Sequence, residues 1–366
     1  MRSKVISKKF SDPHLTRRPV SLKENEEGLV VPTPPTVSVI IPTYNRKDLL
    51  RETLNSLAQQ TYPSDYFEVI VVDDGSTDGT GAIAAEAFPF ILRYFCQSNQ
   101  GDAAARNLGA RQSQADILVF LDDDILVEAG YLTHLIQAYD MGQNNIVIGT
   151  CNLWLAETTP FSKSLYASPA LDYIHTVMEV PFRDVYSNNM SLQREAYFKI
   201  GMMQGLDFPG SSMWCDLDFN YRAYQQGFHF CRSTKAICWH RDYAVGSLDT
   251  HKKRVRTAAY RAVVLFQKYP ELLAHLPMFY DKTPIIWGQD PPRLIARKLA
   301  RSMASSRPAL WSMQQLVSTL EMYYPTSPIL RLLYRYIIGG YIFQGYREGL
   351  NEFGQINNVG DPIRLP

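Results

Sequence analysis

Three consecutive carboxylates, Asp122, Asp123 and Asp124, directly follow the apolar run Ile117–Leu121. A short apolar run of this kind predicts a strand that is buried on both faces. Carboxylates at the end of such a strand can bind a divalent cation, and their hard oxygen atoms suit Mg²⁺ or Mn²⁺. An acidic loop that only faces solvent is the alternative, and its position directly after a buried strand argues against it.

Polar residues also follow three other predicted strands. The pairs of strand and polar segment are Val37–Ile41 with Pro42–Asn45, Phe67–Val72 with Asp73–Asp78, and Ile91–Phe95 with Asn99–Asn107. In an open parallel sheet, ligands bind beyond the carboxyl ends of the strands, so we expect these segments to meet at one edge. One polar loop needs no explanation, whereas four at the same edge indicate a binding site.

The segments between these strands have helical patterns. One apolar face between Lys47 and Gln60 is formed by leucines, and Ala103–Gln112 is rich in alanine with few helix breakers. Strands that alternate with helices of this length form βαβ units, whose helices cover a parallel sheet. We therefore expect an α/β fold whose first half is an open, mostly parallel sheet.

Length and composition exclude several classes of protein. The chain has 366 residues, which predicts one large domain with an appendage, or two domains. Its 37 Lys and Arg against 36 Asp and Glu leave a net charge of +1, too little to hold a nucleic acid. Five cysteines without a CxxC pair indicate neither a disulfide framework nor a zinc site. Without an apolar stretch of roughly 18 residues or a secretory signal, we expect a cytoplasmic protein.

The order of the polar motifs resembles glycosyltransferase family two, the large inverting family with the GT-A fold. The resemblance extends over about residues 37–245 and is carried by Val39–Arg46, Val71–Asp78, Gly101–Gly109, Phe120–Asp124, Asn188–Glu195 and Trp214–Arg222. Each motif is short, but their number and order make chance agreement improbable. The resemblance implies a GT-A fold with a mostly parallel, Rossmann-like sheet, plus a C-terminal helical region.

The resemblance also implies a nucleotide-sugar donor bound at the strand ends. An acidic residue at Asp73 or Asp74 would accept the N–H of the base, and Arg106 would lie beside the base or phosphates unless it is an ordinary exposed arginine. Asn189 would contact the donor sugar or only cap a turn. The implied donor-binding residues are Pro42, Thr43, Tyr44, Asn45, Asp73, Asp74, Arg106, Asp122, Asp123 and Asn189. Because the Asp73 region resembles uracil readers, we expect a UDP-sugar, with dTDP- and GDP-sugars as alternatives.

A divalent metal, Mn²⁺ or Mg²⁺, is the cofactor that the resemblance implies. Asp124 would be a direct ligand, and Asp122 would share the metal or lie nearer the ribose. The predicted strand Ala236–His240 ends in a histidine, and in many GT-A enzymes a histidine at this place completes the metal shell. A single histidine at a strand end can equally be structural. A bound metal would neutralise the charge that grows on the leaving diphosphate.

Asp216 is the expected catalytic base. The family carries a Glu-Asp pair at the start of a helix, and here the pair reads Cys215 and Asp216. The alternative is an Asp that only favours the helix N-terminus. If Asp216 is not the base, Asp218 or Asp207 are the next candidates.

Three parts are expected along the chain: a polar, proline-rich arm over 1–36, a GT-A domain over 37–247, and a helical extension over 248–366. The extension includes a basic helix, His251–Tyr269, and the segment Pro291–Pro308, which has arginines and a lysine but no acidic residue. Beside aromatic-rich helices, such a segment can lie on an anionic membrane surface. It can equally form a lid over the acceptor site with a solvated basic face.

We therefore predict a metal-dependent, inverting glycosyltransferase. It would move a sugar from the nucleotide donor to a hydroxyl of a sugar, a lipid-linked glycan or a small molecule. A sugar-phosphate nucleotidyltransferase is one alternative, but it should begin with a glycine-rich phosphate loop, and Pro42–Arg46 has no glycine. A non-catalytic nucleotide-sugar-binding module is the other, and it would have lost the carboxylates that are present here.

Overall fold

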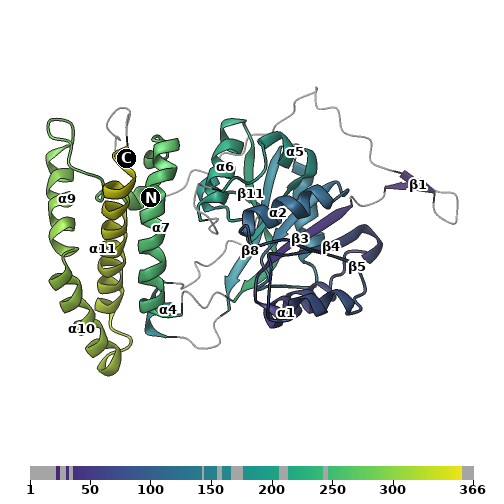
Figure 1. Ribbon diagram of the computed structural model, residues 1–366, viewed down its shortest axis with the longest axis horizontal. Helices are drawn as coiled ribbons and strands as arrows, with labels where there is room; N and C mark the ends of the chain where they lie inside the picture. Colours follow the sequence, from purple (N-terminus) through teal and green to yellow (C-terminus); the bar gives the residue numbers. More distant parts are fainter. Residues whose placement is uncertain are drawn as a thin grey trace.

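The computed structural model describes residues 22–24, 30–32, 36–141, 144–154, 159–165, 176–205, 213–241 and 246–356. Figure 1 shows a sheet domain flanked by helices and, next to it, a group of long helices formed by the C-terminal part of the chain. The two parts correspond to the sheet domain and the helical extension that the sequence predicts.

Four parallel strands form the first half of the sheet, in the order β5-β4-β3-β6. They are β3 (Val37–Thr43), β4 (Phe67–Asp73), β5 (Ile91–Cys96) and β6 (Ile117–Leu121). The sequence predicted all four strands, and the predicted ends lie within two residues of the observed ends. The chain leaves β3 toward β4 on one side and returns to β6 on the other, so the topological switch point lies between β3 and β6.

The second half of the sheet is mixed. Strand β10 pairs antiparallel with β6 and β8, β8 and β11 are parallel, and β11 also pairs antiparallel with β7 and β9. These strands are β7 (Ile125–Val127), β8 (Asn145–Leu153), β9 (Val177–Glu179), β10 (Asn189–Gln193) and β11 (His229–His240). In this half of the sheet, the sequence predicted the last part of β11, which ends at His240.

Helices cover both faces of the sheet, because alternate residues of each buried strand point to opposite sides. Strand residues such as Ile40 pack in a core with α2 (Asp102–Gln112), α5 (Arg194–Ile200) and α6 (Cys215–Gln225). The neighbouring residue Val39 packs in a second core with α1 (Lys47–Leu57) and α3 (Tyr131–Gln137). Short helical turns complete the domain and its linker: η1 (Ser64–Tyr66), η2 (Thr80–Ala85), η3 (Ala138–Met141), α4 (Pro160–Leu165), η4 (Phe182–Asp184), α8 (Leu272–His275) and η6 (Pro277–Phe279).

The C-terminal helices are α7 (Leu248–Lys268), α9 (Pro292–Ala304), α10 (Arg307–Tyr323) and α11 (Pro328–Phe353). Helix α11 packs along α7 (Figure 1). A Cβ atom on Gly345 would lie 2.1 Å from the Arg256 carbonyl oxygen, and one on Gly349 would lie 2.4 Å from that of Tyr260. The glycines that interrupt the aromatic C-terminal stretch therefore allow the two helix backbones to approach closely.

The basic segment of α9 is partly neutralised inside the helical part. Asp281 lies 3.3 Å from Arg297 and 3.1 Å from Arg301, and Asp290 lies 2.6 Å from Lys298. The acidic partners precede the acid-free window in sequence, so the window alone did not predict these ion pairs.

Within the N-terminal arm, β1 (Leu22–Glu24) and β2 (Val30–Pro32) form an antiparallel pair that the sequence did not predict. The other residues of the arm before residue 36 lie outside the described part of the chain. Among the described residues, no helix combines the length and the apolar character that crossing a membrane requires.

Candidate active site

The carboxyl ends of β3 and β6 are joined by side chains. The Thr43 hydroxyl donates to Oδ2 of Asp123 at 2.8 Å, and the Asp74 N–H donates to the Thr43 carbonyl at 2.9 Å. The loops after β3, β4 and β6 thus meet at the switch point of the sheet, as the sequence predicted.

The three carboxylates after β6 pair with two arginines. Asp122 accepts from Arg106 at 2.5 Å, and Asp123 accepts from Arg46 at 3.0 Å. Asp124 accepts from the same Arg46 nitrogen at 3.0 Å through Oδ2. The cluster is therefore held by two arginines that come from opposite sides of it.

Burial raises the pKa values of the three carboxyl groups, whereas the positive charge of the arginines lowers them. Burial raises the pKa of Asp122, although Arg106 opposes it, and raises the pKa of Asp123 to about 7 against the opposing charge of Arg46. Burial also acts on Asp124, but contact with His240 and the charge of Arg46 outweigh it and leave a pKa below the usual value. Asp124 is thus the member of the cluster that is most strongly held as a carboxylate.

Asp124 and His240 are the pair that fits a divalent metal. Oδ1 of Asp124 is buried and accepts no hydrogen bond of good geometry, and Nε2 of His240 lies 3.3 Å from it. Carboxylate oxygen and imidazole nitrogen both suit Mn²⁺, and ions of this class keep coordination positions for water and phosphate. The described residues contain no cluster of three or more His, Cys, Asp or Glu that could hold a metal. Asp122, the third expected ligand, is instead engaged by Arg106.

Arg106 is buried, so it is not the ordinary exposed arginine that the sequence left as the alternative. Its guanidinium pairs with Asp102 at 2.6 Å and with Asp122 at 2.5 Å, and the side chain is only 2% exposed. Its charge also lowers the pKa of Asp216, against the larger effect of burial. Arg106 therefore connects the acidic cluster electrostatically with the start of α6.

Asp73 and Asp74 hold the loops of the same edge. Asp73 accepts the Ser76 N–H at 2.7 Å and the hydroxyl of Tyr94. Asp74 accepts the N–H groups of Gln100 at 2.8 Å and Gly101 at 2.7 Å. Asp73 thus shapes the loop after β4, and Asp74 shapes the backbone that leads into α2.

The segment after β3 is divided between buried and exposed residues. Pro42 and Thr43 are buried, whereas Tyr44 is 48% exposed. Asn45 has a positive φ of 53° and accepts the Thr77 N–H at 2.7 Å, which ties this loop to the one after β4. Tyr44 and Asn45 are accordingly the exposed side chains of this segment, and the Asn45 oxygen is already bonded to Thr77.

Asn189 is engaged inside the sheet. Its amide accepts the Gly149 N–H at 3.1 Å, donates to the Gly149 carbonyl at 3.0 Å and accepts the hydroxyl of Tyr131. The side chain is 3% exposed. The amide thus bonds across to the neighbouring strand β8 and does not cap a turn, and its contact with a donor sugar stays a prediction.

Asp216 lies in the first turn of α6, as expected. The helix follows Trp214, whose φ is 72°, and Asp216 accepts the Leu217 N–H at 2.8 Å. The side chain is half-buried, and burial raises the pKa of its carboxyl above the usual value. A raised pKa brings a carboxylate closer to the basicity that removal of a hydroxyl proton requires.

The alternative bases are less suitable. Asp218 is fully buried and pairs with Arg222 at 2.9 Å and Lys268 at 2.6 Å, so both of its oxygens are occupied by cations. Asp207 lies outside the described residues.

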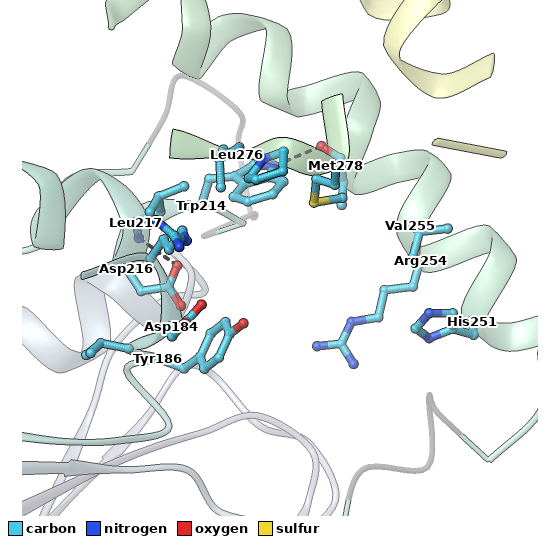
Figure 2. Close-up of a pocket in the computed structure, with 14 residues that line it drawn as sticks. Asp184, Tyr186, Trp214, Asp216, Leu217, His251, Arg254, Val255, Leu276 and Met278 are labelled. Atoms are coloured by element: carbon cyan, nitrogen blue, oxygen red, sulfur yellow. Dashed lines mark hydrogen bonds between the residues drawn. The ribbon is translucent and has the colours of Figure 1, made fainter. Parts of the chain in front are cut away.

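Asp216 opens into a pocket of about 460 Å³ between the sheet domain and the C-terminal helices. Asp184 and Tyr186 lie near Asp216 on one side, and Arg254 of α7 reaches into the same space from the other (Figure 2). The sequence did not single out Asp184, Tyr186 or Arg254. They are separated from Asp216 by about 30 to 40 positions along the chain, and no local motif marks them.

Known proteins resemble this chain in sequence and in fold. Residues 38–208 match the family described as glycosyl transferase family 2. The validoxylamine A glucosyltransferase of Streptomyces hygroscopicus subsp. limoneus is 29% identical over 273 residues, which are 66% of this chain and 58% of that protein. The glycosyltransferase AglE of Haloferax volcanii is 46% identical over 95 residues, covering 25% of this chain and 31% of that protein. The chain thus spans about three fifths of the first relative.

A solved structure shares the fold. The mannosyltransferase PcManGT of Pyrobaculum calidifontis, in complex with GDP-Man and Mn²⁺, is 21% identical, with a TM-score of 0.54. The alignment covers 86% of this chain and 88% of that one, so it extends into the helical part. The sheet with its strand-end carboxylates has the GT-A fold, and residues 38–208 of this chain form a domain of glycosyltransferase family 2.

Proposed function

We propose that this protein is a metal-dependent, inverting glycosyltransferase that transfers a sugar from a nucleotide-sugar to an acceptor hydroxyl. The observation that carries the proposal is the presence of two carboxylates in different surroundings. Asp124 faces His240 at the sheet edge, and Asp216 faces an open pocket. The first arrangement suits a charged diphosphate and the second suits proton removal.

Asp216 takes the proton in the proposed reaction. As the acceptor oxygen forms its bond to the anomeric carbon, the bond between that carbon and the diphosphate oxygen breaks, and the electron pair leaves with the nucleoside diphosphate. One displacement of this kind inverts the anomeric centre. The raised pKa of Asp216 favours proton uptake, and its half-buried position leaves the carboxylate accessible from the pocket.

Asp124 and His240 would hold the metal, which when bound stabilises the negative charge of the diphosphate. Arg46 shares Asp124 and Asp123 in the structure, so its guanidinium lies where it can turn to a phosphate. Arg106 keeps Asp122 in place next to this position.

A UDP-sugar is the donor that we propose, because the segment around Asp73 and Asp74 resembles uracil readers. A GDP-sugar is the first alternative to test, since the solved relative holds GDP-Man.

Peripheral membrane contact stays a prediction. Met303 and Trp311 are 75% and 64% exposed, on α9 and α10, next to arginines that could meet anionic lipid. Removing the chain after Asp281 would strip α11 from α7, so point changes are the better test. Met303→Ser with Trp311→Ser should lower binding to anionic liposomes, and unchanged sedimentation with the vesicles would contradict the contact.

Product identity tests the function. The protein is incubated with UDP-sugars, GDP-Man and dTDP-sugars in Mn²⁺, with and without an acceptor mixture. A transferase releases the nucleoside diphosphate, whereas a nucleotidyltransferase working in reverse with pyrophosphate makes nucleoside triphosphate. Binding without any release of diphosphate would favour the non-catalytic module and overturn the proposal.

A further inference from the structure

Two cysteines lie side by side on β8 and β11, which are neighbouring strands of the sheet (Figure 1). Cys151 on β8 and Cys238 on β11 are in register where the two strands run parallel. Extra residues of β11 between Arg232 and Ile237 shift the register and bring Cys238 opposite Cys151. The two side chains form a hydrogen bond through their thiol groups. The fold thus brings two thiols into contact that lie far apart in the sequence.

The two thiols differ in their access to solvent. Cys151 is exposed, whereas Cys238 is fully buried. All five cysteines of the chain are free thiols in the structure, so the pair is in its reduced form. The hydrogen bond from Cys238 lowers the pKa of Cys151, and the thiolate is the form of cysteine that reacts with an oxidant. An oxidant from solvent therefore meets Cys151 first, with a second thiol directly beside it.

The spacing of the two strands allows a disulfide between these cysteines. Neighbouring strands lie about 4.7–4.9 Å apart, within the range of about 4.4–6.8 Å that disulfides span between Cα atoms. This spacing is larger than the Cβ separation of about 3.8 Å in a relaxed disulfide, so the bond would form under some strain. Strained and solvent-accessible disulfides are the ones that other thiols reduce readily. A disulfide at this place would therefore be reversible.

We propose that Cys151 and Cys238 form a reversible redox pair, in which a hydroperoxide oxidises Cys151 and Cys238 completes a disulfide. The Cys151 thiolate attacks one oxygen of hydrogen peroxide, the O–O bond breaks, hydroxide leaves, and the sulfur becomes a sulfenic acid. The Cys238 sulfur then attacks the sulfur of Cys151, and the S–S bond forms while the hydroxyl leaves with the Cys238 proton as water. Two molecules of a thiol such as glutathione return both cysteines to thiols and become a disulfide themselves.

The redox pair does not depend on the proposed transferase function, although Cys238 lies on the strand that ends at His240. Another exposed cysteine offers a comparison. Cys96 ends β5, and its partner in register on β4 is Asp73. Peroxide can reach Cys96 in the same way, but the described strands pair it with a carboxylate and not with a second thiol. Oxidation of Cys96 should therefore stop before a disulfide forms.

Mass spectrometry of the oxidised protein tests the pair. The reduced, folded protein is treated with hydrogen peroxide, the remaining thiols are blocked with iodoacetamide, and the digested peptides are analysed for disulfide links. The link between Cys151 and Cys238 should exceed every other cysteine pair by about tenfold or more, because the two sulfurs are held together before they react. In protein that is unfolded in urea before the treatment, this preference should be lost, because the strands no longer hold the two thiols in register.

Variants separate the roles of the two thiols. In Cys238→Ser, the sulfenic acid of Cys151 should persist and be trapped by dimedone, whereas in Cys151→Ser the buried Cys238 should stay reduced. The control Cys96→Ser should form the disulfide as the unaltered protein does. Glutathione added to the oxidised, unaltered protein should restore both thiols. The comparison of folded and unfolded protein needs no variant, so it still tests the pair if a serine at position 238 prevents folding.

The redox pair is disproved if the folded protein forms no link between Cys151 and Cys238, or if another pair of cysteines is linked in equal yield. It is also disproved if the link is equally preferred after unfolding, since the preference would then not come from the register of β8 and β11. A link that glutathione does not reduce would contradict its reversibility. Oxidation of Cys238 in Cys151→Ser, at the rate seen in the unaltered protein, would contradict the role of Cys151 as the first thiol to react.

Discussion

The proposed donor edge, formed by the residues after β3, β4 and β6, and the proposed acceptor pocket, which contains Asp216, are built in opposite ways. At the donor edge, Asp122, Asp123 and Asp124 are already paired with arginines from the same domain. In the pocket, Asp216 accepts a backbone N–H of its own helix, and the opposite wall comes from the C-terminal helices. The donor edge is thus preorganised by internal ion pairs, while the pocket depends on how two parts of the chain are joined.

This difference has a physical reason. Every nucleoside-diphosphate sugar carries the same diphosphate charge, so one fixed set of cations and carboxylates can bind each of them. Acceptors differ in shape and charge, and a wall from a separate helical part can change without disturbing the sheet. The comparison predicts that changes at the donor edge affect binding and stability, whereas changes in the pocket affect turnover.

The largest effect is expected from Asp124→Ala. Removing this carboxylate leaves His240 without the oxygen ligand that faces it, so Mn²⁺-dependent transfer should be abolished and UDP binding in Mn²⁺ weakened. Calorimetry of UDP with and without Mn²⁺ measures this, and Asp48→Ala on the exposed side of α1 is the control. Unchanged Mn²⁺-dependent affinity would remove Asp124 from the metal site.

Asp216→Asn should act on turnover alone. Asn keeps the size of the side chain but cannot take the proton, and a positioned general base contributes roughly 10²- to 10⁴-fold in rate. We expect kcat to fall in that range with an unchanged Kd for the donor. Asp184→Asn, in the same pocket, should cost less, and near-normal turnover of Asp216→Asn would disprove the base assignment.

Arg106→Gln should destabilise the donor edge. The buried guanidinium pairs with Asp102 and Asp122, and both carboxylates are partly exposed, so water can replace some of the lost interaction. We expect a loss of about 1–3 kcal/mol in the free energy of unfolding. Urea denaturation measures it against Arg111→Gln, an exposed arginine of the same helix. Equal midpoints for the two variants would show that the ion pairs contribute nothing.

The pH dependence of turnover should report Asp216. Its pKa is raised above the usual value by burial, and only the deprotonated form can accept a proton. The rate should therefore fall as the pH decreases through this raised pKa, by up to about tenfold per pH unit. The acidic limb of the kcat profile should be absent in the residual activity of Asp216→Asn. An unchanged limb in that variant would assign it to another group.

The sequence predicted the donor edge better than the pocket, because the donor edge is built within one domain and the pocket joins two distant parts of the chain. Asp73, Asp122 and their neighbours follow apolar strands directly, so strand patterns place them at one edge. Arg254 reaches the pocket only through the packing of α7 against the domain, and no local pattern encodes that packing.

Other differences also come from long-range contacts. The ion pair of Arg301 was not predicted, because its partner Asp281 lies outside the acid-free window. Asn189 lay within a recognised motif, yet its amide bonds to Gly149 on the neighbouring strand. A motif gives the position of a side chain, whereas its partners depend on which strands become neighbours.

Cys215→Ser should have the smallest effect, although Cys215 stands beside the base. The thiol is 2% exposed and packs in the core with α2 and α5, and burial raises its pKa, which keeps it neutral. A neutral thiol cannot share the proton transfer, so the loss in kcat should stay below the ~10²-fold that a general base contributes. Cys215→Ala, which removes the polar atom altogether, is the matched control, and kcat is measured for both with the donor at saturation. Because the side chain is buried in the core, its replacement should lower stability more than rate. A loss of turnover as large as that of Asp216→Asn would instead show that position 215 takes part in proton transfer. It would also contradict the comparison between a preorganised donor edge and a pocket that controls turnover.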